Sequence, residues 1–308
     1  MESQPANCQP LPVKLIFNSG AGAVDESPVQ LLDIINELQR WRFVPEAYLF
    51  EPNSDLVAIV QDALERNIRM FVVCGGDGTI ESTAGALIGK EAVLGIIPTG
   101  TRNNVALSLG IPNGISGAVS LLRTGRTMKL DVGYATCGGS SRIFLETCSI
   151  GLFSALYPAA EDLRHGNLGG LSGFLATLIA SPVAKIRLVM DSLPEKSIQG
   201  HVAFVVNLPY AGPNFPIASK VLFDDGLLDV LIFSDQSKLE ILANMIQIAG
   251  KKWDETNIER YQAQRVEIYT NPPLPVMTDG FPLGEGIVKI KVQPCALTVM
   301  AGETAAIG

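Results

Sequence analysis

The first third of the chain alternates between short apolar runs and longer amphipathic segments. The apolar runs are rich in branched and aromatic residues, which is typical of buried strands; they cover residues 13–17, 47–50, 70–73 and 92–97. Between them, apolar residues recur at helical spacing, which predicts helices that begin at Ser27 and near Asn53. This alternation predicts a parallel sheet covered by helices on both faces.

From about Gly133 onwards, strands dominate the pattern and few helical segments lie between them. The strand-like runs cover residues 143–149, 186–190, 203–207, 227–233, 265–269 and 287–292. Strands that follow one another in this way predict an antiparallel β domain rather than further β–α–β units. We therefore expect two domains, residues 1–132 and 133–308, with the last strand returning to the first domain.

A glycine-rich turn, Cys74–Thr79, lies between the third apolar run and the next helical segment. Such a turn lets backbone N–H groups approach a phosphate, and the positive end of the following helix adds favourable electrostatics. Three glycines within four residues are costly in a mere connector, because glycine loses the most entropy on ordering. The turn favours a nucleotide-phosphate site; a tight left-handed turn without a ligand is the alternative.

Two more polar loops, residues 18–22 and 98–104, follow predicted strands of the same sheet. Ligands of parallel sheets bind beyond the carboxyl ends of the strands, so we expect these loops to meet the glycine-rich turn. Thr101 and the Asn103 amide could reach a phosphate or an adenine edge, and Arg102 could pair with phosphate oxygens. Capping of the next helix by Thr101 or Asn103 explains the same residues equally well.

Two acidic loops lie in the second half of the chain. The segment Phe223–Leu227, with Asp224 and Asp225, is compatible with a hard-cation site and with a polar hairpin turn. The pair Asp279–Gly280 is typical of a hairpin turn and, taken alone, indicates little about catalysis.

The composition argues against several functions. The 308-residue chain has a net charge of −8, which argues against nucleic-acid partners and against electrostatic docking on anionic lipid, so we expect any membrane contact to be hydrophobic. Five scattered cysteines without a CxxC pair, and only two histidines, support neither a disulfide framework nor a zinc site. The longest apolar stretch, 168–184, is too short to span a bilayer comfortably. We expect a soluble cytoplasmic protein.

Taken in order, several motifs resemble those of the diacylglycerol kinase catalytic-domain family, which includes bacterial soluble lipid kinases and sphingosine kinases. The likeness covers nearly the whole chain. The motifs are Asn18–Gly20, Gly75–Thr79, Pro98–Asn103, Leu109–Pro112, Leu130–Gly133, Glu146, Ile150–Gly151, Asn167–Gly169, Asp224–Val230 and Asp279–Gly280. The resemblance implies a phosphofructokinase-like α/β nucleotide domain, a β-sandwich domain and ATP bound between them.

The resemblance also implies roles for individual residues and an activity. Asp279 matches the catalytic base that takes the proton from the lipid hydroxyl. A Mg²⁺ site maps onto Asp225 and the backbone carbonyls of Leu222 and Leu227. The expected activity is ATP- and Mg²⁺-dependent transfer of the γ-phosphoryl group to a hydroxyl of diacylglycerol or a related lipid. The protein would meet this lipid peripherally, at a membrane surface. A homodimer is a separate expectation, which no motif implies. The residues expected to bind the nucleotide are Asn18, Gly75, Gly76, Asp77, Gly78, Thr79, Thr101 and Asn103.

Three positions depart from the family pattern. Glu81-Ser82 stands where the family has Asn-Glu, Asn104 replaces an aspartate, and Phe281 replaces the glutamate of an Asp-Gly-Glu motif. Loss of two carboxylates near bound Mg²⁺ and ATP weakens divalent-ion binding, and Glu285 is the candidate to replace one of them. A nucleotide- or lipid-binding protein without phosphoryl transfer is therefore an alternative, and an NAD kinase, which shares the GGDGT sequence, is a weaker one.

Overall fold

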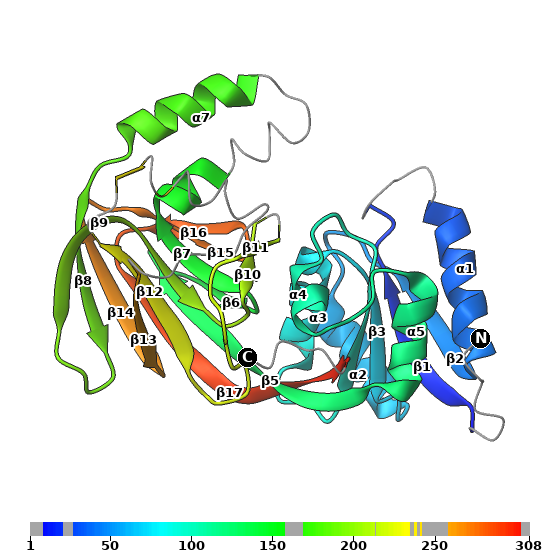
Figure 1. The fold of residues 1–308 in the computed structure, drawn as a ribbon. Coiled ribbons are helices and arrows are strands. Elements are labelled where there is room, and N and C mark those ends of the chain that lie inside the picture. The colour runs from blue at the N-terminus through cyan, green and yellow to red at the C-terminus, as the bar shows by residue number, and fades with distance from the viewer. Residues whose placement is uncertain are drawn as a thin grey trace. The chain divides into compact units, whose positions relative to one another are not determined.

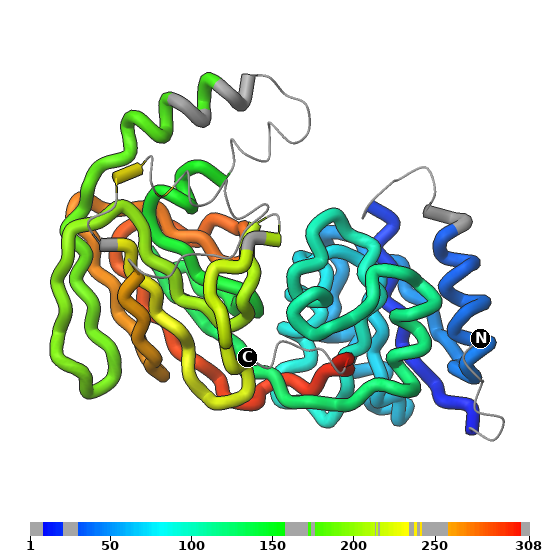
Figure 2. Tube along the Cα trace, viewed as in Figure 1, coloured from blue at the N-terminus to red at the C-terminus, as the bar shows by residue number. Residues whose placement is uncertain are grey.

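The computed structural model describes residues 9–20, 27–157, 169–212, 214–234, 237–238, 241 and 258–302. The chain folds into two compact units, of which the first joins the residues up to Leu130 to those from Cys295, and the second runs from Asp131 to Pro294. Two long strands, β5 (Arg126–Cys137) and β17 (Val288–Ala301), belong in part to each unit, and the tube in Figure 2 follows both of them. No helix among the described residues is long and apolar enough to cross a membrane.

The first unit is built on a parallel sheet in the order β17–β4–β3–β1–β2 (Figure 1). All six residues of the central strand β3 are buried, as expected for a strand covered by helices on both faces. The predicted α/β alternation is therefore confirmed. The elements are β1 (Leu11–Phe17), α1 (Ser27–Arg40), β2 (Phe43–Leu49), α2 (Leu56–Glu65), β3 (Met70–Gly75), α3 (Asp77–Leu87), β4 (Val93–Pro98), α4 (Asn104–Ser108) and α5 (Ile115–Thr124).

β2 begins before the pattern predicts, whereas α2 begins directly after the segment predicted to start it. β2 begins at Phe43, four residues earlier than predicted, and includes Pro45. It pairs with β1 at the edge of the sheet, where the missing N–H of a proline costs no ladder hydrogen bond. α2 begins at Leu56 because the Asp55 carboxylate caps it, accepting the N–H of Ala58 at 3.0 Å.

The second unit is antiparallel, as predicted, and two buried apolar clusters form its core. Strand β9 is central, since it pairs with β7, β8 and β12. Helix α7 (Gly169–Ala180) precedes β8, and residues 152–157, after β7, are helical as well. The strands besides β5 and β17 are β6 (Ser140–Phe144), β7 (Thr147–Gly151), β8 (Ala184–Met190), β9 (Lys196–Val206), β10 (Tyr210–Ala211), β11 (Phe215–Pro216), β12 (Leu228–Ser234), β13 (Ile258–Ala263), β14 (Arg265–Asn271), β15 (Pro275–Thr278) and β16 (Phe281–Glu285).

The run 143–149, predicted as one strand, contributes to two strands, β6 and β7. The chain turns between them at Leu145 and Glu146, and both of their backbone N–H groups donate to the carboxylate of Asp279. The turn therefore depends on a residue more than 130 positions away in the sequence, and no local pattern could have predicted it.

Candidate functional site

Three loops of the first unit lie at one edge of the parallel sheet. Asn18 follows β1, the glycine-rich turn follows β3 and residues 99–103 follow β4, and these three strands are parallel neighbours. The side-chain amide of Asn18 donates to the hydroxyl of Thr79 at 2.7 Å, which ties the first loop to the second. The oxygen of the same amide accepts the N–H of Gly20 at 2.9 Å. The structure thus brings together the loops that the sequence analysis expected to meet.

The second and third loops touch through glycine backbone. A Cβ atom on Gly100 would lie 2.3 Å from Gly76 Cα and 2.9 Å from Gly76 N. A Cβ atom on Gly75 would lie 2.8 Å from Thr79 Cβ. Neither position therefore accepts a side chain, and much of the glycine content of the turn is explained by packing within the protein.

The N-terminus of α3 has the character of an anion site. Gly76 is its capping residue, and no side chain there accepts a hydrogen bond from the first-turn N–H groups. These N–H groups, together with the positive end of the helix dipole, stabilise a negative charge close to the helix end. Gly78 and Thr79 lie in this first turn.

Asp77 and Asn103 brace these loops from within. One carboxylate oxygen of Asp77 accepts the N–H of Val105 at 3.1 Å, which links the start of α3 to α4. Burial raises the pKa of Asp77, and the N–H groups of the α4 terminus oppose that rise. Asn103 adopts a left-handed conformation and makes two side-chain hydrogen bonds to the backbone of Gly100, at 3.0 and 2.9 Å. Its side chain forms no capping bond to α4, so the capping explanation considered for Asn103 is wrong.

The sequence analysis proposed Thr101 as a nucleotide ligand but missed its neighbour Thr99. The Thr99 hydroxyl is buried and has no hydrogen-bond partner among the described residues. A buried hydroxyl without a partner is costly, which makes it a candidate to bind a ligand group at the end of β4. Its place in the Pro98–Asn103 motif was the available signal. Thr101 is exposed in the same loop.

Two of the three departures from the family pattern lie inside the first unit. Glu81 is 3% exposed and Asn104 is 1% exposed. Both side chains therefore belong to the packed interior of the unit around α3 and α4. Changes at these two positions therefore affect the packing beneath the loops rather than a surface that a ligand would touch.

Asp279 holds a turn of the second unit. Its two carboxylate oxygens accept the N–H groups of Leu145, Glu146 and Thr147 at 2.7, 3.0 and 2.8 Å. The residue has a positive φ of 46° between β15 and β16, and a Cβ on the next residue, Gly280, would lie 2.4 Å from a tyrosine hydroxyl. A carboxylate has about four acceptor sites, so at most one remains for an incoming hydroxyl in this conformation.

The hairpin after Asp279 places Phe281 and Glu285 at opposite ends of β16. The Phe281 ring packs under the guanidinium of Arg142, 4.0 Å from ring centroid to Arg142 Cζ. Glu285 pairs in register with Pro275, at the far end of the β15–β16 ladder. Four residues of extended strand span about 13 Å, so Glu285 does not stand where the family's glutamate would.

Two carboxylates, one inside the loop and one outside it, hold the backbone of the acidic loop before β12. One oxygen of Asp225 accepts the N–H of Leu227 at 2.9 Å, and the buried Asp131 accepts the N–H of Gly226 at 2.6 Å. Leu222, at the start of the loop, is 44% exposed. The oxygens of this loop are hard donors of the type that Mg²⁺ prefers, and Asp225 supplies one carboxylate. In the part of the chain that the structure describes, no group of three or more His, Cys, Asp and Glu residues could hold a metal ion.

Comparisons with known proteins agree with this architecture. Residues 12–135 match the model of the diacylglycerol kinase catalytic domain, and residues 161–301 match that of the YegS C-terminal NAD kinase beta sandwich-like domain. Together the two matches cover most of the chain. The chain belongs to the diacylglycerol kinase catalytic-domain family, and it carries the YegS-type sandwich as its second domain.

Relatives and solved structures match nearly the whole chain. A "Probable lipid kinase YegS-like" of Klebsiella pneumoniae (strain 342) is 26% identical, over 93% of this chain and 95% of its own. The protein sll0036 of Synechocystis sp. is also 26% identical, over 93% of this chain and 69% of its own. A solved diacylglycerol kinase from Bacillus anthracis str. Sterne covers 96% of this chain and 98% of its own, with a TM-score of 0.71 at 22% identity. A second solved structure from that organism covers 95% and 98%, with a TM-score of 0.75 at 24% identity. At these identities the solved structures establish the fold alone.

Proposed function

We propose that this protein is a lipid kinase that transfers the γ-phosphoryl group of ATP to a hydroxyl of diacylglycerol or a related lipid. The observation that carries the proposal is the joining of the three loops at the carboxyl edge of the sheet. Asn18 is bonded to Thr79, and Gly76 touches Gly100, within the domain that matches the diacylglycerol kinase catalytic model. Phosphoryl transfer depends mainly on positioning and charge stabilisation, which such a braced set of loops supports.

In this proposal the nucleotide phosphates bind at the first turn of α3. The N–H group of Gly78 and the hydroxyls of Thr99 and Thr101 are the groups of this chain that would hold them, whereas the N–H of Thr79 already donates to the carbonyl of Gly76 at 3.0 Å. The unpartnered Thr99 hydroxyl and the uncapped helix end fit an anionic ligand. Asp77 and Asn103 keep the loops in place rather than contact the phosphates, since their side chains are bonded to backbone groups.

Asp279 would accept the proton of the lipid hydroxyl, as the family pattern implies. Three N–H donors fix its carboxylate in one orientation, and a carboxylate held in this way can accept the proton of a hydroxyl that comes within hydrogen-bond distance. The same three hydrogen bonds also give Asp279 a structural role, because they hold the turn between β6 and β7. Any variant of Asp279 therefore needs a stability measurement beside its activity.

Magnesium would contribute charge that the acidic chain lacks, by neutralising the phosphates of ATP. We propose that a Mg²⁺ ion also binds the loop of Leu222, Asp225 and Leu227, where the donors are hard oxygens. The lipid acceptor implies peripheral contact with a membrane surface, and we propose a cytoplasmic protein that makes this contact.

The test is transfer of label from γ-labelled ATP to a total lipid extract in mixed micelles with Mg²⁺. The unaltered protein runs beside Asp279→Asn, with urea unfolding of both. A labelled lipid with the first protein and none with an equally folded second one supports the kinase and its base. Absence of any labelled lipid with the unaltered protein contradicts the proposal, and NAD as the acceptor in a parallel reaction tests the NAD kinase alternative.

A binding protein without transfer is the second candidate, and one observation favours it. Phe281 occupies the place of the family's glutamate and is packed against Arg142, so that position provides no carboxylate. Under this alternative, ATP binds the loops of the first unit, but no lipid becomes labelled. The variant Phe281→Glu then tests whether one missing carboxylate explains the lack of transfer. If the variant transfers phosphate to a lipid, the missing carboxylate at position 281 is the cause.

A further inference from the structure

A cluster of basic side chains lies on the outer face of the second unit, on residues that the proposed kinase chemistry does not use. Along β17, Val288, Ile290 and Val292 are buried while Lys289 and Lys291 between them are exposed. The period of two along a strand places both lysines on the same solvent-facing side. They therefore present two positive charges to solvent on one stretch of strand.

The neighbouring strand β14 adds a third cation in an unfavourable position. In the antiparallel register, Glu267 lies directly opposite Lys289, whereas Arg265 lies directly opposite Lys291. The first pair forms an ion pair at 3.2 Å. The second pair brings like charges together, an arrangement that destabilises a sheet.

This second pair makes no ion pair in the described part of the chain. Neither Arg265 nor Lys291 has a carboxylate within ion-pair distance among the described residues. The backbone N–H of Arg265 donates to Asp191, so that carboxylate is already engaged with the main chain. The ammonium of Lys291 lies 5.1 Å from the ring centroid of Tyr134, a cation–π contact that leaves its charge in place.

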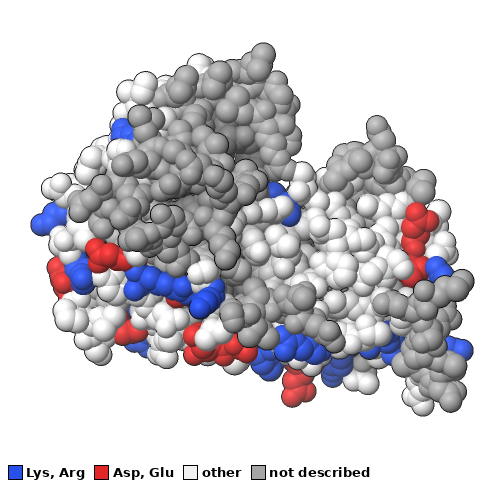
Figure 3. All heavy atoms as spheres, viewed as in Figure 1, with Lys and Arg blue, Asp and Glu red and all other residues white. Residues whose placement is uncertain are grey.

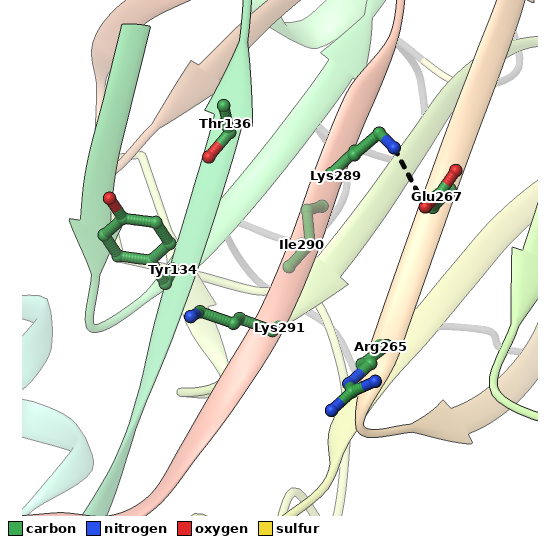
Figure 4. A pocket seen from close by; sticks show the side chains of 7 residues that line it. All are labelled: Tyr134, Thr136, Arg265, Glu267, Lys289, Ile290 and Lys291. Carbon is green, nitrogen blue, oxygen red and sulfur yellow. Dashed lines mark ion pairs between the residues drawn. The ribbon is translucent and has the colours of Figure 1, made fainter.

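These side chains surround a pocket of about 290 Å³ (Figure 4). Figure 4 shows Arg265 on one strand, Lys289 and Lys291 on the next, and Tyr134 and Thr136 on the third. The volume is at the lower end of the range for small-ligand sites, which suits a compact group. With three cations and one carboxylate, the lining has a local charge opposite to that of the whole chain.

We propose that this pocket binds a phosphate group, with Arg265 as a two-pronged donor and Lys291 as a point charge beside it. Arginine matches phosphate geometry bidentately, and an anion between Arg265 and Lys291 removes their mutual repulsion. The whole-chain charge of −8 does not exclude this, because screening limits its influence to about 8–10 Å in physiological salt. Figure 3 shows Lys and Arg side chains in short stretches on the drawn face, with Asp and Glu side chains beside some of them.

The phosphate group has two sources, a soluble phosphate compound and the headgroup of an anionic phospholipid. Titration calorimetry with inorganic phosphate and with glycerol 3-phosphate measures the first. Flotation with vesicles of phosphatidylcholine, with and without phosphatidylglycerol, measures the second. All these readouts are of binding, so they are independent of whether the protein transfers phosphoryl groups.

The decisive variant is Arg265→Gln with Lys291→Gln. Its matched control is Lys185→Gln with Lys220→Gln, which removes the same charge from exposed positions outside the pocket. We expect the pocket variant to lose at least about tenfold in affinity for the probe that binds, and the control to lose little. Glu267→Gln should strengthen binding, because it releases Lys289 from its ion pair.

The outcomes separate the sources and test the site. If the pocket variant weakens binding of the soluble compounds alone, the ligand is a soluble phosphate compound. If it weakens binding to the phosphatidylglycerol vesicles, the ligand is a membrane headgroup. Equal loss in the pocket variant and the control overturns the proposal, since general charge would then explain the binding. Absence of binding to every probe overturns it as well.

Discussion

The contact between Gly76 and Gly100 makes the substitution Gly100→Ala a severe test of the nucleotide loops. The added Cβ would stand 2.3 Å from Gly76 Cα, whereas carbon atoms in contact prefer about 3.5–4.0 Å. The loops must therefore separate by about 1 Å, and the obstacle is backbone, which cannot rotate away. Overpacking of this kind costs about 1–3 kcal/mol, and we expect a loss near the upper end.

We expect Gly100→Ala to affect ATP binding as well as stability. Separation of the loops moves the start of α3 away from Thr99 and Thr101, so we expect ATP affinity to fall at least about tenfold, since a misplacement near 1 Å is costly. Urea unfolding gives the stability, and calorimetric titration with ATP gives the affinity.

The matched control is Gly114→Ala. Gly114 precedes α5 with extended backbone, and a Cβ there would have nothing within 4 Å. We expect its effect on stability to stay within about 0.5 kcal/mol, with ATP binding unchanged. If Gly100→Ala behaves like this control in both measurements, the reasoning about the loop contact is refuted.

Three further predictions concern charge and pH, and unfolding in urea across a pH series measures each of them. Hydrogen bonds, chiefly from Arg66, lower the pKa of Glu46 to about 2, so its stabilisation is present above the ordinary pKa and lost as pH falls towards 2. Because Glu46 is 39% exposed, Glu46→Gln should cost only about 1 kcal/mol at pH 7, and this cost should shrink as the pH falls towards 2. Arg260→Gln removes the ion-pair partner that lies 2.9 Å from the buried Asp229 carboxylate. We expect the free energy of unfolding to fall by about 3 kcal/mol at pH 7. Burial raises the pKa of Asp229, so this loss should shrink towards pH 4, as the carboxylate takes up a proton. Burial lowers the pKa of His201, so stability should fall as pH drops below about 6.5, and His201→Gln should remove that dependence.

The fold could be predicted because its signals are local. Runs such as Met70–Val73 are short, apolar and branched, and the intervening segments have helical spacing, so the class and order of the elements follow from the pattern. Parallel neighbours then bring their carboxyl ends to one edge, which correctly predicted that the loop after the first strand meets the glycine-rich turn; the bond from Asn18 to Thr79 joins the two. The family resemblance and the fold class are confirmed, whereas the roles assigned to individual site residues stay predictions.

The rest depends on contacts between residues that are distant in the sequence. The division of 143–149 into two strands needs the carboxylate of Asp279, and the like-charge pair of Arg265 and Lys291 exists only in the observed register of β14 and β17. A register shift of one residue would put these side chains on opposite faces. Strand register and contacts between distant residues produce no periodic pattern in the sequence, so the sequence could not predict them.

The central claim is tested most directly by whether the purified protein moves phosphate from ATP to a lipid of known structure. Diacylglycerol in mixed micelles, γ-labelled ATP and Mg²⁺ form the complete reaction, and omission of each component in turn provides the controls. The account predicts a labelled lipid phosphate that appears only in the complete reaction and that falls at least about tenfold, at limiting ATP, with Gly100→Ala. ATP binding without any labelled lipid, from this acceptor or from a total lipid extract, would contradict it.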